Sequence, residues 1–588
     1  MKNFLQRIIK SNKIHAVIIA LLFIIAINYY FNLETIVISF FNILIFYMTY
    51  LFCKQEIKCE KKEKRIAYAY GLITSGLLLI GKSVYNYHDL FYLVSNVYMA
   101  ILTFASLIGF ATVIGKAFLL FSVKIAQKQL ENEEKQWKKL KEKKCIVFIF
   151  IIIIVSFLPA FYAYYPGIFS YDMQNQMNEI MNGITMFHPP IHTFIWLCCF
   201  KINGFLGLEA ITIYAIIQMI FFAIVYTKFI KFLINRKVNN WMVLFALLFI
   251  TVNPVISIFS IVATKDTYFA GFLLLTMISL AEYISYDGKI SIIKKIELII
   301  FIVLSCLFRN NAIYVFIICL IIFTIFGKNK KDNFITFLTP IIIFYIIIKV
   351  LYPFLGVEKG NIREMLSVPM QQIALVVSKH EDELDNESKE EIAKFLNYNL
   401  IKQDFNYRFA DPIKEWFNTD FFKKNKGEFI KLWLKLLLKY PKDFINEFLD
   451  LNIPYWYIDA KVIDDYAHRG YIETGIFPSE YYKATRVNED SALYKYYNKV
   501  ANYELFDNIP IISRIFSLSF PSFVLTFALF ISIFKNDKKM ILFFIPLILL
   551  LATYILGPVS NFRYIFPIFI QYPLVFISII LNKKIFIE

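Results

Sequence analysis

The stretch from Cys145 to Ala163 reads CIVFIFIIIIVSFLPAFYA and contains no charged side chain. A helix needs about 20 predominantly apolar residues to cross the roughly 30 Å hydrocarbon core of a bilayer. Apolar blocks of similar length recur on both sides of this stretch along most of the chain. A transmembrane β-barrel would instead show alternating segments of about ten residues. The pattern therefore predicts an all-α polytopic membrane protein.

The composition of the 588-residue chain agrees with this interpretation, because 58% of the residues are hydrophobic and only 18% are charged. A soluble domain is about one-quarter charged, so a soluble enzyme, a secreted disulfide scaffold and a disordered chain are excluded. The seven cysteines lie in or beside apolar blocks, and none has the spacing of a zinc site. The net charge of +17 resides mainly in short loops between apolar blocks, which does not favour nucleic-acid binding.

The basic loops predict the orientation of the helices, because cytoplasmic loops of membrane proteins carry an excess of Lys and Arg. The polar stretch 353–510 contains 21 Lys and Arg but 26 Asp and Glu, so we expect it outside the cell. Segment 164–208 is also expected outside, with 189–206 as a re-entrant or interfacial helix, because a simple hairpin there would place Lys228 and Lys231 outside. Both termini are then cytoplasmic, and the chain is a multi-pass protein of the cell membrane.

About fourteen transmembrane helices follow from these rules. We expect four of them in an N-terminal region, 1–144, which ends in a cytoplasmic amphipathic segment at 116–144. A core follows at 145–352, then a mostly helical extracytoplasmic domain at 353–510, and three further spans in 511–588. The expected spans are 15–32, 35–53, 66–83, 92–115, 145–163, 209–230, 241–259, 267–284, 292–308, 312–326, 334–352, 512–534, 540–557 and 563–581.

One apolar stripe within 353–510 has helical spacing and two explanations. It could form the core face of a small helical domain, or it could lie on the membrane surface. The stripe consists of Phe429, Ile430, Trp433, Leu434, Leu437 and Leu438.

The first outer loop concentrates side chains that could perform chemistry at the membrane boundary. Asp172 lies just beyond a predicted span, with Tyr171 before it, and Glu179, His188 and His192 follow. A partly desolvated aspartate could act as a general base. Alternatively, it could hold a divalent cation that neutralises a phosphate. A solvated loop without chemistry is the remaining alternative.

Three further outer segments carry cations. They contain Lys265-Asp266, Arg309-Asn310 and Arg563. Arginine binds phosphate oxygens through two N–H groups, and a cation at membrane depth is usually functional. The three segments therefore suit an anionic, lipid-linked substrate. The alternatives are a helix cap for the Lys-Asp pair and interfacial anchoring for the arginines.

Taken together, these residues resemble the outer loops of the C-type (GT-C) superfamily of integral-membrane glycosyltransferases, such as the protein mannosyltransferases and the lipid A aminoarabinose transferases. The run Asp172…Gly183…His188-Pro-Pro is similar to their first outer loop, in which an acid, a glycine and a basic-Pro-Pro element precede a helix along the membrane. Many of those enzymes have paired acids in this loop, whereas Met173 follows Asp172 here and Glu179 would substitute.

A closer resemblance links the chain to a family of uncharacterised multi-spanning proteins of Gram-positive bacteria placed near that superfamily. Pro-Gly…Ser-Tyr-Asp, Lys-Asp, Arg-Asn-Asn and Gly-Pro-Val…Arg-Tyr recur in that family and in this chain. The resemblance covers roughly 145–581, so the first four spans are additional to a GT-C-like core.

The resemblance implies a glycosyltransferase with an extracytoplasmic active site, which moves a sugar from a polyprenyl-phosphate donor to a cell-wall or surface glycan. Asp172 would be the general base, assisted by Asp266 or Glu179, and Lys265, Arg309 or Arg563 would hold the donor phosphate. A divalent cation, Mg²⁺ or Mn²⁺, at Asp172 and Asp266 is the one cofactor to consider. No nucleotide is implied, because the chain has no P-loop or Rossmann glycine motif. The remaining expected substrate-binding residues are Tyr171, His188, His192 and Asn310.

Three other functions remain open from the residues alone. One is a structural membrane protein, which explains the cluster of outer polar residues poorly. A transporter or lipid flippase would place charges or broken helices inside the spans, near the bilayer midplane. An envelope polymerase or ligase of another fold would also expose Arg and His side chains outside. The spans contain few charges and no clear internal repeat, which favours the transferase.

Overall fold

The computed structural model describes residues 12–33, 40–128, 143–360, 362–461 and 471–586. Most of these residues are helical, and the strands among them are β1 (Ile168–Phe169) and β2 (Val262–Ala263), which pair in parallel. Within the described ranges, nine helices are long and apolar enough to cross a membrane. The prediction of an all-α, multi-pass membrane protein is therefore confirmed. The nine are Asn12–Tyr30, Lys61–Tyr87, Val97–Ile125, Lys143–Ala163, Ala210–Asn235, Lys265–Ser285, Lys330–Phe354, Lys538–Ile555 and Phe562–Ile580.

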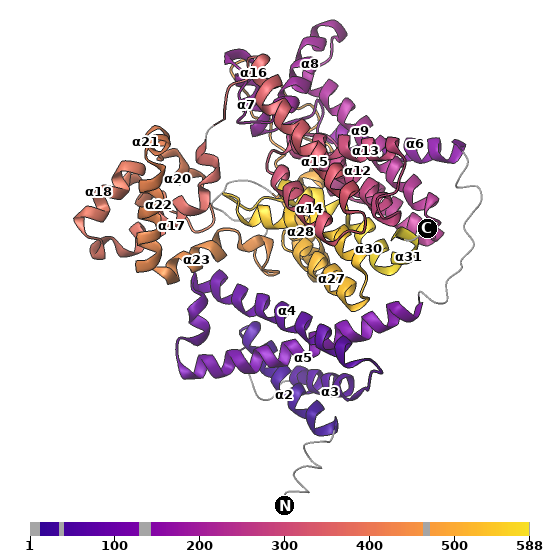
Figure 1. Cartoon of the computed structure of the whole chain (residues 1–588), viewed down its shortest axis with the longest axis vertical. Helices are drawn as coiled ribbons and strands as arrows, with labels where there is room; N and C mark the ends of the chain where they lie inside the picture. The colour runs from indigo at the N-terminus through magenta and orange to yellow at the C-terminus, as the bar shows by residue number, and fades with distance from the viewer. Residues whose placement is uncertain (1–11, 34–39, 129–142, 361, 462–470, 587–588) are drawn as a thin grey trace, which may run out of the picture.

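The first helices form a unit of their own at the bottom of Figure 1. The helices Lys61–Tyr87 and Val97–Lys128 approach each other closely at Gly71 and Ala111. A Cβ added to Gly71 would lie only 2.1 Å from the carbonyl oxygen of Ala111. The buried Lys116 donates to the carbonyls of Cys53 and Gln55 at 2.6 Å each and so closes a helix end. The unit consists of α2 (Asn12–Tyr30), α3 (Phe40–Lys54), α4 (Lys61–Tyr87), η1 (Leu90–Val94) and α5 (Val97–Lys128).

The predicted end of the fourth span is wrong. Helix α5 continues to Lys128 instead of ending at 115, because residues 117–123 are still mostly apolar. The rest of the expected amphipathic segment, 129–142, lies outside the described residues.

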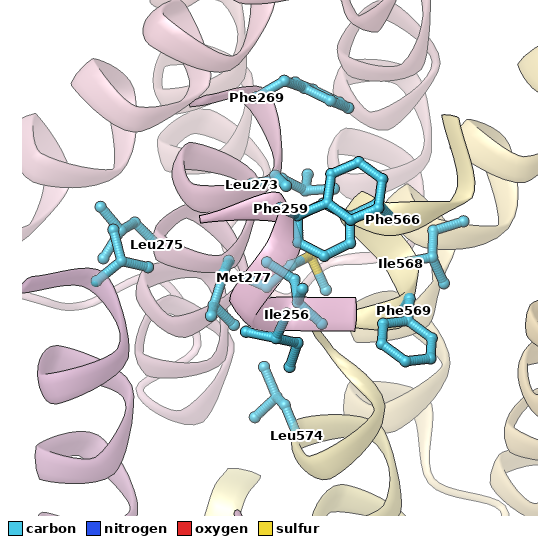
Figure 2. Close-up of a cluster of buried hydrophobic side chains, with 14 of the residues drawn as sticks. Ile256, Phe259, Phe269, Leu273, Leu275, Met277, Phe566, Ile568, Phe569 and Leu574 are labelled. Carbon is cyan, nitrogen blue, oxygen red and sulfur yellow. The ribbon is translucent and has the colours of Figure 1, made fainter. Parts of the chain in front are cut away.

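The main bundle surrounds α12 (Lys265–Ser285), which is buried along most of its length. Figure 2 shows part of its core, in which Phe259 stacks on Phe566 with ring centroids 4.1 Å apart. Residues from the predicted region 145–352 and from the predicted C-terminal spans both contribute to this hydrophobic interior. The other helices of the bundle are α6 (Lys143–Ala163), α9 (Ala210–Asn235), α13 (Ile292–Phe308), α14 (Ala312–Phe326), α15 (Lys330–Ile346), α27 (Phe520–Phe534), α28 (Lys538–Ile555), α29 (Phe562–Phe569), α30 (Tyr572–Ile580) and α31 (Asn582–Phe586).

Three predicted spans are interrupted by residues that end or restart a helix. Span 241–259 divides at Asn253, whose side chain caps α11 (Pro254–Phe259) after α10 (Asn240–Val252) has ended. Span 563–581 divides between α29 and α30, just before Pro573. Span 512–534 divides between α26 (Pro510–Ile515) and α27, just before Pro521. Proline fits the first turn of a helix but lacks the N–H that would continue the preceding one.

Residues 362–451 form a separate lobe, drawn in orange on the left of Figure 1, with a hydrophobic core of its own. In α22 (Lys426–Lys439), the buried residues are Phe429, Leu432 and Leu436, whereas Ile430, Leu434 and Leu438 are exposed. The helix thus joins a domain core, as one alternative predicts, through Phe429, Trp433 and Leu437 of the predicted stripe together with Leu432 and Leu436. The lobe also contains η4 (Ile362–Met365), α17 (Ser367–His380), η5 (Glu381–Glu383), α18 (Asn386–Phe395), α19 (Tyr398–Gln403), α20 (Asp411–Glu415), α21 (Thr419–Lys424) and α23 (Pro441–Leu451).

The end of the predicted outer domain packs with the main bundle rather than with the lobe. Helix α24 (Ala492–Ala501) contacts α6, and Val500 belongs to the main core. Phe506 of α25 (Glu504–Asp507) belongs to the same core. This packing brings the chain around 471–491 beside the segment 164–208, which is predicted to be the first outer loop.

Candidate functional site

Two short segments with matching sequence patterns meet at one end of the main bundle. Each strand is followed by a hydroxyl residue, a variable residue and an aspartate, in Ser170-Tyr171-Asp172 and Thr264-Lys265-Asp266. The hydroxyl residues are the N-caps of α7 (Tyr171–Asn182) and α12. Because β1 and β2 pair in parallel, the two helices begin side by side with both aspartates in their first turns. The Ser170 hydroxyl donates to the Ala263 carbonyl and joins the two turns.

These aspartates form one ion-pair network with three cations. Lys265 donates to Asp172 Oδ2 at 2.7 Å, and Arg563 Nη1 lies 3.2 Å from Asp172 Oδ1. Arg563 Nε lies 3.9 Å from Asp266 Oδ2, and Arg309 donates to Asp266 Oδ1. The structure therefore brings together five of the predicted site residues from four separate parts of the chain.

The network is shielded from water. Asp172 and Asp266 are 4% and 0% exposed, and Arg563 is 8% exposed. Burial alone would raise the pKa of Asp172, but the charges of Arg563 and Lys265 outweigh this effect and hold that pKa well below its usual range. Asp172 is therefore ionised at neutral pH and, in this arrangement, a weak proton acceptor.

Aromatic side chains and helix ends position the two arginines. Arg309 follows α13, and its guanidinium lies 4.8 Å from the ring centroid of Tyr554 and 4.7 Å from that of Tyr564. Arg563 lies in the first turn of α29 and donates to the Tyr564 hydroxyl at 3.1 Å. Arg309 Nε and Arg563 Nε and Nη1 are buried without a hydrogen-bond partner in the described part of the chain. Buried donors of this kind are uncommon, so these atoms are available to a ligand oxygen.

The two predicted histidines have different environments. His188 Nδ1 lies 3.2 Å from Lys265 Nζ, and burial lowers the pKa of His188 to about 3, so it is neutral at pH 7. His192 lies outside the charge network, because its ring nitrogens contact Gln176 Oε1 at 2.8 Å and the Tyr214 hydroxyl at 2.7 Å. It thereby joins α8 (Pro190–Leu206) to α7 and α9.

Three other predicted residues lie around the network. Glu179, two turns along α7 from Asp172, accepts a hydrogen bond from the Thr185 hydroxyl at 2.7 Å, and burial raises its pKa to about 7. Asn310 is next to Arg309 in the chain, and its buried Oδ1 has no partner among the described residues. Tyr171 is partly exposed, and its ring packs edge-on against Phe477.

A carboxylate that sequence reasoning missed lies beside the network. Glu473 Oε1 accepts a hydrogen bond from the backbone N–H of Tyr171 at 3.0 Å, while its Oε2 is buried without a partner in the described ranges. The Phe477 N–H donates to the Phe169 carbonyl at 3.0 Å and holds this part of the chain against β1. No motif marks Glu473, which lies far from Asp172 in the sequence. It lines a small pocket with Ser170, Phe259, Val262, Thr264, Ile472, Asn561 and Arg563.

The donor set does not fit a divalent cation. Of the residues that the structure describes, no group of three or more His, Cys, Asp or Glu side chains is arranged to hold a metal ion. Asp172 and Asp266, the expected ligands, are paired instead with Lys265, Arg309 and Arg563. Cations held this close to the two carboxylates would repel a metal ion, and their N–H groups suit the oxygens of an anionic ligand.

Comparison with known proteins places the chain in one family. No curated protein and no solved structure matches it. Residues 206–586 match a family described as a family of unknown function (DUF6020). This match spans more than half of the chain and contains Lys265, Asp266, Arg309 and Arg563, whereas the loop with Asp172 precedes it. The protein therefore belongs to the family of unknown function DUF6020.

Proposed function

We propose that the protein is a GT-C-like membrane glycosyltransferase that transfers a sugar from a polyprenyl-phosphate donor to a cell-wall or surface glycan. The observation that best supports this proposal is the buried network of Asp172, Lys265, Asp266, Arg309 and Arg563. An inverting sugar transfer requires cations for the departing phosphate and a carboxylate for the acceptor hydroxyl. The network contains both the cations and the carboxylate that this reaction requires.

The donor phosphate binds at Lys265 and Arg563 in this proposal. Both cations reach the same carboxylate, so they are close enough for two oxygens of one phosphate. Arg563 also has buried N–H groups without a hydrogen-bond partner among the described residues. Arg309 is held by Asp266 and two tyrosine rings, and its proposed role is to keep Asp266 and the α13–α14 turn in place.

The transfer itself needs one base and one leaving group. The acceptor oxygen forms a bond to the anomeric carbon, and the bond from that carbon to the phosphate oxygen breaks. The electron pair leaves with the phosphate, where Lys265 and Arg563 stabilise the charge, and the hydroxyl proton passes to Asp172. The free oxygen of Glu473 lines the adjacent pocket and is positioned to hold the acceptor hydroxyl.

We further propose about fourteen spans, cytoplasmic termini and a site on the outer face. Four shorter apolar helices, Phe40–Lys54, Asn240–Val252, Ala312–Phe326 and Phe520–Phe534, add to the nine long ones among the described residues, and α13 completes the count. At the end of α12 opposite the site, Asp287 pairs with Lys328 at 2.8 Å and with Lys539 at 3.1 Å. These basic turns gather on one face, which supports a cytoplasmic assignment for it.

A transporter or flippase is the second candidate, because Asp266 and Arg563 are buried charges within candidate membrane helices. Transporter sites lie near the bilayer midplane. Asp266 and Arg563 instead occupy the first turns of α12 and α29, which favours chemistry at the membrane surface.

The test uses the full-length protein in liposomes with radiolabelled undecaprenyl-phosphate sugars and envelope glycan fragments. We expect transfer by the wild type and none by Asp172→Asn. Asp287→Asn, at the opposite end of α12, is the control and should transfer at the wild-type rate. Mass spectrometry of the envelope glycans of a deletion strain identifies the missing sugar. An unchanged glycan profile, together with lipid translocation in the liposomes, would favour the transporter.

A further inference from the structure

Asp172 engages both cations to which the proposed donor phosphate would bind. Its Oδ2 accepts a hydrogen bond from Lys265 at 2.7 Å, and its Oδ1 lies 3.2 Å from Arg563 Nη1. A phosphate would present two oxygens to a lysine and an arginine in the same way. The Asp172 carboxylate therefore lies where the two oxygens of a phosphate would meet Lys265 and Arg563.

The charges around Asp172 are balanced before any ligand binds. His188, which faces Lys265, adds no charge at neutral pH. An additional anion can enter this buried cluster only if one carboxylate gives up its partners, because an uncompensated buried charge is costly. The balanced set consists of Lys265, Arg309 and Arg563 with Asp172, Asp266 and Glu473.

The geometry indicates which carboxylate gives up its cationic partners. The contact between Arg563 and Asp172 is an ion pair without good hydrogen-bond geometry, since Arg563 Nη1 and Nε have no hydrogen-bond partner among the described residues. Phosphate oxygens could form the hydrogen bonds that Asp172 does not form. Asp266, by contrast, is completely buried and bonded to Arg309, which two tyrosine rings cover. Asp172 is thus the partner that is easier to displace.

We infer that Asp172 is a built-in placeholder for the donor phosphate, which occupies Lys265 and Arg563 until a polyprenyl phosphate displaces it toward the acceptor. This inference rests on the proposed function. The exchange links donor binding to catalysis, because a carboxylate that loses its cationic partners becomes a stronger base. Until a donor binds, Asp172 therefore stays paired with the two cations, is a weak base and does not activate water.

Binding of undecaprenyl phosphate to the full-length protein in nanodiscs of neutral lipid tests the exchange. Asp172→Asn removes the competing charge and keeps the shape of the side chain, so we expect tighter binding, on the order of tenfold. Arg563→Gln should weaken binding on the order of tenfold or more. The matched control is Asp287→Asn, which removes a carboxylate held by Lys328 and Lys539 and should bind like the wild type.

Equal or weaker binding by a folded Asp172→Asn variant would overturn the inference. If Arg563→Gln still weakens binding in that case, the proposed phosphate site remains supported. If neither the wild type nor Asp172→Asn binds undecaprenyl phosphate, the proposed function fails as well. If Asp172→Asn does not fold, cryo-electron microscopy of the wild-type complex decides. A phosphate at Lys265 and Arg563 with Asp172 displaced supports the inference, whereas a bound phosphate beside an intact Asp172–Lys265 pair contradicts it.

Discussion

Among single residues of the site, Arg309 should contribute most to stability. Its carboxylate partner, Asp266, is completely buried, and the rings of Tyr554 and Tyr564 flank its guanidinium. We expect Arg309→Gln to lower the free energy of unfolding by about 3–5 kcal/mol, because it leaves Asp266 as an uncompensated buried charge. Thermal unfolding in detergent measures the change. The double variant Arg309→Gln/Asp266→Asn should recover much of the loss, and a double variant no more stable than the single one would contradict this explanation.

Glu179 should make stability depend on pH. Burial raises its pKa from 4.5 to about 7, so the native protein binds a proton there more tightly than the unfolded chain does. The resulting stabilisation is fully present below pH 4.5 and is lost as the pH rises through 7. Glu179→Gln, which stays uncharged, should remove this loss. Melting temperatures measured from about pH 5 to pH 8 provide the comparison, and parallel curves for the two proteins would refute the prediction.

At the scale of elements, the contact between α4 and α5 depends on glycine. A Cβ at Gly71 would lie 2.1 Å from the Ala111 carbonyl oxygen, whereas one at Gly76 on the same helix meets nothing within 4 Å. We expect Gly71→Ala to lower stability by about 1–3 kcal/mol, because the helices must move apart. Gly76→Ala should be neutral or slightly stabilising, since alanine favours helix more than glycine does. Unfolding of both variants in the same detergent checks the contrast, and equal effects would exclude close helix approach as the cause.

At the scale of the whole molecule, the orientation in the membrane can be tested directly. Asn178 on α7 and Asn399 on α19 are exposed, and both belong to segments expected outside the cell. In a chain whose seven native cysteines are replaced, Asn178→Cys and Asn399→Cys should react with a membrane-impermeant thiol reagent on intact cells. Lys330→Cys, in a basic turn expected inside, should react only after permeabilisation. The reverse pattern would place the charge network in the cytosol.

The sequence by itself determined the membrane class, the positions of most apolar helices and the choice of Asp172, Lys265 and Arg309 as residues of interest. These are local properties, because the length and hydropathy of a block, or a charge beside it, can be read without knowing what it contacts. Prediction from the sequence was less reliable on α22, where several faces of the helix are equally apolar. It was also less reliable at Pro573, where a proline divides a predicted span.

Only the tertiary structure decided which charges meet. Asp172 reaches Lys265 because β1 pairs with β2, and it reaches Arg563 because α29 packs against α12. The place of Glu473 beside them depends on hydrogen bonds from the chain around 471–491 to the first outer loop. Such contacts join residues that are 93 positions apart, as for Asp172 and Lys265, or 302 apart, as for Tyr171 and Glu473. The burial that makes their charges interact strongly exists only in the folded bundle.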